Sequence, residues 1–493
     1  MGSIPSPGTT TIDRPVTERA HPVRRTLFLL LFLPLGFAGC ASNSEVAELD
    51  ERLAGPGDYI RAPYMVTVTD SSAVVRWRSS RPVQPGFRFW AVDGDTLTET
   101  LPASGLDHTF EMVDLVAATD YFYQVRVQDT IWTEAVEFRT FPEPGSREPF
   151  TFLAMGDTGT LSSGQVALAA QINQEEAALI IHMGDVAYPD GTEQELTDKH
   201  FAVYGPILKR APFYPAPGDH DLRVNWGEPY INAFTPPEGR PSGSPLYYSF
   251  THDNVRFIAL DSQASEEHAA RFGYVGDPSS EQYQWLLTEL SAAKADPAID
   301  WTVVYFHHGP YSASTGFGGH GSDLAVRQFL APLMDGYGVP IVITGHDHDY
   351  QRSRPIRANE VAPENEGTVY LVTGGGGGRR TFRGTGADWF TAYSDQIYEY
   401  VRVEVDHYTM SLEAVDVDGN VFDSFELTIP EDGRKPFARD AVPLTMPGRD
   451  EDAAQEVPEG EFAPAGGQPA QGGSTAPAPQ SSPAERPVPD TPR

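Results

Sequence analysis

Five apolar segments in the middle of the chain each end in a Gly-Asp pair or a histidine, and this series constrains the fold most strongly. In an α/β domain, functional loops lie at the carboxyl ends of the strands. A single Gly-Asp pair is more typical of an Asx turn than of a site. Carboxylates and then histidines at five successive strand ends indicate a common site. These residues are Asp157, Asp185, Asp219, His307, His346 and His348.

The last of these loops, Gly345–Tyr350, follows the apolar run Ile341–Thr344. Its two histidines are two residues apart, so each imidazole can reach a metal, and the leading glycine permits a tight turn. Alone, such a pair is more typical of two solvated loop histidines. A metal-binding role for the pair therefore depends on partners from the other strand ends.

Length and charge limit the function classes. The 493 residues predict more than one domain and a sizeable core. The net charge of -34 argues against nucleic acid or an anionic membrane surface as the main partner. An anionic substrate would be repelled unless the site carries its own positive charge.

The sole cysteine, Cys40, ends a segment with the pattern of an export signal. Arg24 and Arg25 precede an apolar run that is too short to span a bilayer as a mature helix. The Ala-Gly-Cys ending resembles a bacterial lipobox, with Phe37 where that pattern prefers leucine. We expect residues 1–40 to be a lipoprotein signal peptide, and the protein to be exported and anchored to a bacterial membrane through lipid on Cys40, facing the periplasm or the outside. Ordinary secretion with an incidental cysteine is the alternative.

After a linker at 41–60, residues 61–141 show period-two alternation broken by turn residues, which predicts a β-sandwich. Trp77, and Leu115 ahead of Tyr121, resemble a fibronectin type III module with its tyrosine corner. Both aromatic residues are most simply core residues. The predicted strands are 65–68, 73–77, 87–90, 121–127 and 135–140.

Residues 148–430 alternate strands with helices and predict an α/β domain. Beyond residue 440 the chain is rich in Pro, Gly and Ala and lacks the apolar surface needed to fold, so 440–493 is predicted to be a disordered tail. The predicted strands are 150–155, 179–182, 247–250, 255–260, 301–306, 400–405 and 410–415, and the predicted helices are 163–175, 281–293 and 323–334.

The ordered motifs GDTG, GDVAY, GDHD, VYFH and GHDH, which begin at residues 156, 184, 218, 304 and 345, resemble those of the calcineurin-like metallophosphoesterases. Tyr188 and the preceding sandwich narrow the resemblance to the purple acid phosphatases. The resemblance implies an N-terminal all-β sandwich followed by a four-layer α/β/β/α sandwich, and an exported hydrolase of phosphate esters.

The resemblance also implies a dinuclear metal centre. On the family pattern, one ion is bound by Asp157, Asp185, Tyr188 and His348, and the second by Asp185, Asp219, His307 and His346. Tyrosinate suits a trivalent ion, and imidazole with carboxylate suits a divalent one. The expected cofactors are therefore Fe(III) with Fe(II), Zn(II) or Mn(II).

Such a centre would cleave phosphate monoesters by attack of metal-bound hydroxide, with both cations stabilising the transferred phosphoryl group. His220 is placed to protonate the leaving alkoxide, and Asp221 is expected to orient its imidazole. His320 either contacts the phosphate or is an ordinary loop histidine. His308, beside His307, is expected to be structural.

Asp219 departs from the family pattern, which has a neutral asparagine at this position. Aspartate in place of asparagine adds a negative charge, so the net positive charge of the metal centre is one unit lower. We expect weaker attraction for phosphate dianions, or a stronger requirement for a trivalent first ion, and an effect of Asp219→Asn on KM or metal content. Monoanionic diesters would suffer less.

Two further features are interpreted without a catalytic role. The run Gly374–Gly378 lacks the ending of a P-loop, so it is expected to give the backbone a close approach to the metal loops. Arg352 either faces the site or is solvated.

Three functions remain open at this stage. A small phosphate ester is the expected substrate of a phosphatase. A phosphodiesterase using the same centre is the first alternative, and a non-catalytic surface-binding lipoprotein with a degenerate metal site is the second.

Overall fold

The structure is a computed structural model that describes residues 59–430, apart from 102–104, 127–131, 236–238, 316–318 and 381–387. The predicted signal peptide with Cys40, nearly all of the linker and the predicted tail lie outside the described residues. Within the described part, none of the helices combines the length and apolar character needed to cross a bilayer.

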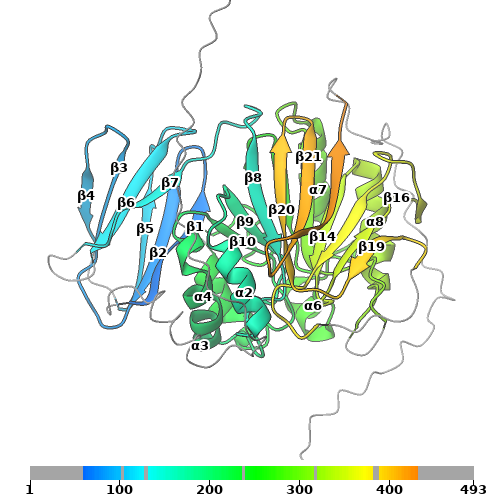
Figure 1. The fold of residues 1–493 in the computed structure, drawn as a ribbon, viewed down its shortest axis with the longest axis horizontal. Coiled ribbons are helices and arrows are strands. Elements are labelled where there is room, and N and C mark those ends of the chain that lie inside the picture. The colour runs from blue at the N-terminus through cyan, green and yellow to red at the C-terminus, as the bar shows by residue number, and fades with distance from the viewer. Residues whose placement is uncertain are drawn as a thin grey trace, which may run out of the picture. The chain divides into compact units, whose positions relative to one another are not determined.

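The first seven strands form two antiparallel sheets, with strand orders β1-β2-β5 and β4-β3-β6-β7 (Figure 1). β1 begins at Tyr59, slightly before the predicted start of the sandwich. The bounds are β1 Tyr59–Val68, β2 Ala73–Ser79, β3 Gly86–Ala91, β4 Leu97–Thr100, β5 Asp107–Met112, β6 Asp120–Arg126 and β7 Val136–Arg139.

Aromatic side chains fill the sandwich as the alternating pattern predicts. Trp77 and Tyr121 are 2% and 6% exposed, and the rings of Phe87 and Tyr123 stack with centroids 5.5 Å apart. The Tyr121 hydroxyl accepts a hydrogen bond from the Val116 amide at 3.0 Å, which is the contact expected of a tyrosine corner. Trp77 and Tyr121 are therefore core residues, as predicted.

Two larger sheets follow, of six and seven strands, and they face each other. The first has the order β10-β9-β8-β20-β21-β22 and the second β11-β12-β13-β14-β18-β15-β19. The bounds of the first are β10 Phe213–Pro215, β9 Leu179–His182, β8 Phe150–Met155, β20 Glu399–Asp406, β21 Thr409–Asp416 and β22 Val421–Thr428. Those of the second are β11 Tyr248–His252, β12 Val255–Ala259, β13 Trp301–His308, β14 Ile341–Gly345, β18 Val369–Thr373, β15 Tyr350–Ser353 and β19 Thr391–Asp395. A small hairpin joins β16 Ile356–Arg357 to β17 Glu360–Val361.

Helices cover the outer face of each sheet and complete the predicted α/β/β/α layering. Along β8, Phe152 and Ala154 point into the core between the sheets, whereas Leu153 and Met155 pack under the first group of helices. The first group is α2 Ser163–Ile172, α3 Glu193–Leu196, the π-helix Thr197–Phe201, α4 Ala202–Leu208, the 3-10 turn Asn225–Gly227 and α5 Glu228–Phe234. The second is α6 Glu266–Phe272, α7 Glu281–Ala295 and α8 Leu324–Tyr337, which pack on the other sheet.

The parallel strands of both sheets end at the same edge of the molecule. β8, β9 and β10 run parallel in one sheet, and β12, β13, β14 and β18 in the other. At this edge the sheets nearly touch, since a Cβ on Gly156, after β8, would lie 3.5 Å from the Cα of Gly345, at the end of β14. The loops after these strands therefore meet.

Tyr214, on β10, connects the α/β domain to β1 of the sandwich. Its buried hydroxyl accepts a hydrogen bond from the Val68 amide at 3.1 Å and donates one to the Val68 carbonyl at 3.0 Å. Two buried backbone groups thus depend on one side chain.

Tyr214→Phe is expected to lower the free energy of unfolding by about 2 kcal/mol, because both backbone groups of Val68 lose their partner in a buried environment. The urea midpoint of the variant, followed by fluorescence, measures this loss. An unchanged midpoint would contradict the contact.

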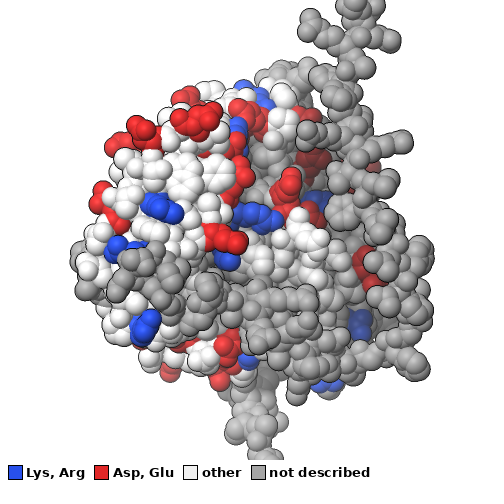
Figure 2. Space-filling view, turned by 60° about the vertical axis from the view of Figure 1, so that its left-hand side comes forward, with Lys and Arg blue, Asp and Glu red and all other residues white. Residues whose placement is uncertain are grey.

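The molecular face in Figure 2 carries acidic side chains beside scattered basic ones. Among the described residues on that face, the basic groups do not merge into one continuous patch.

Candidate metal centre

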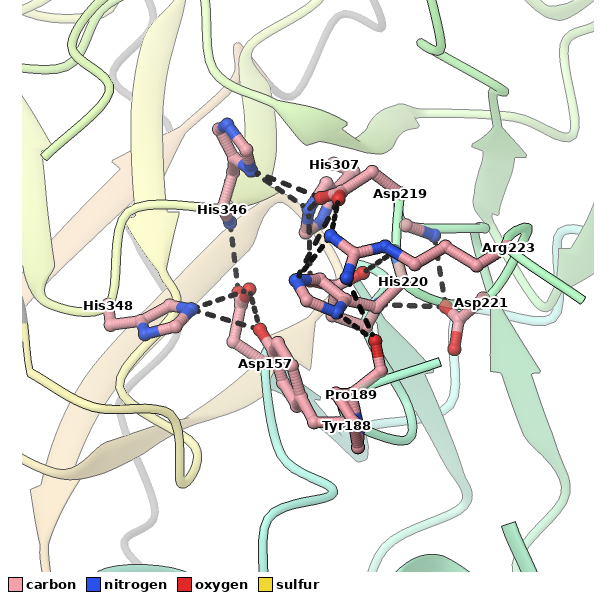
Figure 3. A network of polar contacts seen from close by, with 12 residues as sticks. Asp157, Tyr188, Pro189, Asp219, His220, Asp221, Arg223, His307, His346 and His348 are labelled. Carbon is pink, nitrogen blue, oxygen red and sulfur yellow. Dashed lines mark hydrogen bonds and ion pairs between the residues drawn. The ribbon is translucent and has the colours of Figure 1, made fainter. Parts of the chain in front are cut away.

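Side chains that follow or end several strands converge where the two sheets meet, as Figure 3 shows for those it labels, and the Asp185 carboxylate lies among them. Asp157 follows β8, Asp185 and Tyr188 follow β9, Asp219 follows β10, His307 lies on β13, and His346 and His348 follow β14. The structure thus brings together every residue of the two predicted ligand sets.

One half of the cluster contains Asp157, Tyr188 and His348. The Tyr188 hydroxyl lies 2.9 Å from Asp157 Oδ1 and 2.9 Å from His348 Nε2. His348 Nε2 is 3.4 Å from the same aspartate oxygen, and its Nδ1 donates to the Arg379 carbonyl at 2.8 Å. That second hydrogen bond fixes the imidazole with Nε2 facing the cluster.

The other half contains Asp219, His307 and His346. His307 Nε2 lies 3.4 Å from Asp219 Oδ1 and 3.1 Å from His346 Nδ1. The Nδ1 of His307 donates to the Met183 carbonyl at 2.7 Å, so its Nε2 points into the cluster. With His308 beside them, three imidazole nitrogens and one carboxylate oxygen lie within 4.8 Å of one another.

Asp185 lies between the two halves. Its carboxylate groups with Asp157 and His307 in one set of possible metal-ligating atoms, and with Asp219 and His220 in another, each spanning less than 4.8 Å. Its Oδ2 is 3.6 Å from His307 Nε2. The Asp185 carboxylate is therefore within reach of both halves of the cluster.

The backbone turns sharply at three of these positions. Asp157, Asp185 and His346 have φ values of 58°, 57° and 70°, in the left-handed region that aspartate and histidine occupy only occasionally. Backbone of this kind costs conformational energy and concentrates at functional sites. Here it directs side chains from different strands toward one point.

Burial and crowding of carboxylates define the electrostatics. Burial, reinforced by Asp219 and Asp157, raises the pKa of Asp185 to about 7. Burial opposes a charge on His307, but Asp185, Asp219 and Asp157 outweigh it and hold the pKa of His307 well above its usual value. Burial and the two nearby carboxylates likewise raise the pKa of the Tyr188 phenol.

This donor set fits metal ions. Buried carboxylates that repel one another gain most from a bound cation, which would also favour the phenolate of Tyr188. Carboxylate, phenolate and imidazole suit first-row ions such as iron, zinc and manganese.

His220 lies beside the cluster, but Asp221 does not orient it, and the prediction of that contact is wrong. Both oxygens of the buried Asp221 carboxylate accept hydrogen bonds from the backbone amides of Asp185, Val186 and Gly218, at 2.8, 2.9 and 3.0 Å. These three backbone amides, and not the His220 imidazole, therefore hold the Asp221 carboxylate in place. The Nδ1 of His220 instead donates to the Pro189 carbonyl at 2.5 Å.

His320 and His308 both contact His346. The ring centroids of His320 and His346 are 3.9 Å apart, and His320 is exposed. The His308 ring lies 4.4 Å from that of His346, and its Nδ1 is 2.8 Å from Ser262 Oγ. Arg352 pairs with Asp423 at 2.8 Å instead of with the cluster.

Sequence reasoning missed two groups of contacts. Arg223 donates to Asp219 Oδ2 at 3.0 Å. The spacing of four residues between these opposite charges could have indicated the contact from the sequence. The carboxylates of Asp347 and Asp349 turn away from the cluster and accept hydrogen bonds from the hydroxyls of Ser312 and Ser314. These serines hold the loop that carries His320.

The glycine run approaches the metal loops as predicted. A Cβ on Gly374 would lie 2.2 Å from the Asp347 carbonyl, and one on Gly376 would lie 2.3 Å from the Gly156 carbonyl. A Cβ on Gly378 would lie 2.4 Å from His348 Nδ1. The bare backbone of this run therefore leaves room for the His348 imidazole.

Gly378→Ala is expected to displace the His348 imidazole and weaken metal binding by about 10- to 100-fold, the range found when a supporting contact of a ligand is lost. Gly205→Ala is a matched control, because a Cβ there meets no atom within 4 Å. Competition with a chelator measures both affinities. Equal affinities in the two variants would contradict the predicted role of Gly378.

Comparison with known proteins agrees with this geometry. The family model for calcineurin-like phosphoesterases matches residues 150–350, and the model for iron/zinc purple acid phosphatase-like protein C matches residues 367–424. Residues 150–424 therefore carry a purple acid phosphatase-like metallophosphoesterase region.

Three similar proteins illustrate this relationship. An uncharacterised Mycobacterium tuberculosis protein is 30% identical over 54% of this chain and 57% of its own length. Purple acid phosphatase 22 of Arabidopsis thaliana is 26% identical over 69% of this chain and 73% of its own length. The solved structure of purple acid phosphatase PPD1 from yellow lupin shares the fold, with a TM-score of 0.65, 21% identity and coverage of 79% of this chain and 78% of that one. The chain thus spans little more than half the length of the mycobacterial relative.

Proposed function

We propose that the protein is a dinuclear metal-dependent phosphohydrolase that cleaves phosphate monoesters. The observation that carries this proposal is the convergence of seven side chains with oxygen or nitrogen atoms that could bind metal, with Asp185 between the two halves. The two family matches support it.

We assign the ligands residue by residue. Asp157, Tyr188 and His348 would hold one ion, Asp219, His307 and His346 the other, and Asp185 would bridge them. Two bound cations would make water nucleophilic near neutral pH and stabilise the charge on the transferred phosphoryl group. Iron in the Tyr188 half, with iron, zinc or manganese in the other, fits the donor types.

His220 is assigned as the proton donor to the leaving group. Its Nε2 lies 3.9 Å from Asp185 Oδ2 and 3.7 Å from Asp219 Oδ2, at the edge of the cluster. The hydrogen bond from Nδ1 to the Pro189 carbonyl holds the ring in that position. His320, whose ring covers His346, is assigned to the phosphate.

The test is hydrolysis of p-nitrophenyl phosphate and bis(p-nitrophenyl) phosphate by chelator-treated protein before and after loading with iron and zinc. The expected result is metal-dependent turnover with a higher kcat/KM for the monoester. A preference for the diester would favour the phosphodiesterase alternative. Metal-loaded protein that cleaves neither ester would favour a binding role.

Two features of the remaining chain complete the proposal. The sheet order β1-β2-β5 and β4-β3-β6-β7, with the Tyr121 contact, supports a fibronectin type III-like module ahead of the hydrolase. The sequence pattern around Cys40 supports export and lipid anchoring in a bacterial membrane. Mass spectrometry of the mature N-terminus tests this second assignment.

A further inference from the structure

Arg223 brings a positive charge to the cluster on the loop that also carries Asp219. Its Nη2 donates to Asp219 Oδ2 at 3.0 Å and lies 3.1 Å from His220 Nε2, and its Nη1 donates to the Pro189 carbonyl at 3.1 Å (Figure 3). Three contacts therefore fix the guanidinium beside the carboxylate that departs from the family pattern.

The position of Arg223 bears on the charge of the centre. Asp219 carries a negative charge where an asparagine would be neutral, and a unit positive charge at 3.0 Å offsets it. Arg223 thus places its positive charge beside the one carboxylate that the family pattern lacks.

Arg223 also retains donors for a ligand. The side chain is 43% exposed, and a guanidinium has five N–H groups. Among the described residues, the Nε–H and one Nη1–H make no hydrogen bond. Asp190, the other carboxylate near Arg223, lies 3.9 Å from Nη1, beyond hydrogen-bond distance. Solvent or a ligand can therefore reach these two N–H groups.

Building on the proposed function, we infer that Arg223 binds the phosphoryl group of the substrate and replaces the positive charge that Asp219 removes. A guanidinium N–H can donate a charge-assisted hydrogen bond to a phosphate oxygen. Arg223 is thus a specificity-determining residue. It favours dianionic monoesters over monoanionic diesters, because the dianion gains more from the added charge.

Variants at positions 223 and 219 test this role in the full chain loaded with iron and zinc. Calorimetry with inorganic phosphate gives a binding constant that does not depend on turnover. KM and kcat for p-nitrophenyl phosphate and for its bis ester, together with metal content, give the remaining readouts. Arg139→Gln is the matched control, since Arg139 is 52% exposed and pairs with Asp120 at 2.9 Å, in the sandwich.

Arg223→Gln is expected to weaken phosphate binding and to raise the monoester KM about 10- to 100-fold, which is the effect of losing a charge-assisted contact. The bis ester KM should rise less, and metal content should stay near wild type. Arg223→Lys should recover part of the affinity. Combining Arg223→Gln with Asp219→Asn should bring phosphate affinity back to within about threefold of wild type.

Three results would overturn the role of Arg223. One is phosphate affinity in Arg223→Gln equal to that of Arg139→Gln. Another is loss of metal from Arg223→Gln, which would make the residue structural. The third is a double variant that binds phosphate as weakly as Arg223→Gln alone. If the wild-type protein hydrolyses neither ester, the proposed function fails, whereas the calorimetric comparison still decides whether Arg223 binds phosphate.

Discussion

Asp185→Asn is expected to reduce kcat/KM for p-nitrophenyl phosphate by about 10³-fold or more. The side chain is 1% exposed and contributes to both halves of the cluster. Asparagine keeps an oxygen that can accept the His220 amide hydrogen bond, which Asp185 Oδ1 now accepts at 2.9 Å. It removes the charge and one of the two oxygens that a bridge needs. Activity and metal content should therefore fall together while the fold is retained.

Asp198→Asn is the matched control for this experiment. Asp198 is an exposed carboxylate that contacts Gln194 at 2.8 Å, on the first helical layer. It should keep wild-type activity and metal content. An Asp185→Asn variant that also kept both would exclude a bridging role for Asp185.

His220→Ala is expected to lower kcat by about 10²- to 10⁴-fold, the usual contribution of a positioned proton donor. The loss should be larger for an alkyl phosphate than for p-nitrophenyl phosphate, because an alkoxide leaving group needs a proton more than p-nitrophenolate does. Rates for the two esters, measured on the same preparations, check this dependence.

Metal content distinguishes this role from direct ligation. The Nε2 of His220 is close enough to Asp185 and Asp219 to share a cation with them. A proton donor can be removed with the metals retained, whereas removal of a ligand releases an ion. Loss of metal from His220→Ala, with equal losses for both esters, would contradict the assignment as proton donor.

The strands that carry the site could be predicted because each is marked by an apolar run in its own segment of the sequence. Phe150–Met155 and Leu179–His182 are continuous apolar runs, and the structure places β8 and β9 at these bounds. β4, Leu97–Thr100, was missed because all four of its residues are exposed and show no alternation. β5 and the helices before β11 were also missed, because their positions depend on packing against distant segments.

The orientation of individual side chains could not be predicted. Asp221 follows His220 in sequence, and this suggested a pair, but its carboxylate is held by the amides of Asp185 and Val186, more than 30 residues earlier. The Pro189 carbonyl, which does hold His220, comes from that same distant loop. Asp347 and Asp349 likewise turn toward serines on another segment. Contacts between loops decide these orientations.

A metal titration tests the central claim most directly. Chelator-treated protein is given increasing iron and zinc, and hydrolysis of p-nitrophenyl phosphate is plotted against metal ions bound per chain. A dinuclear centre predicts little turnover with one ion bound and full turnover with two, accompanied by a visible absorption band that Tyr188→Phe removes. Full turnover with one ion, or two bound ions with no hydrolysis of either ester, would contradict it.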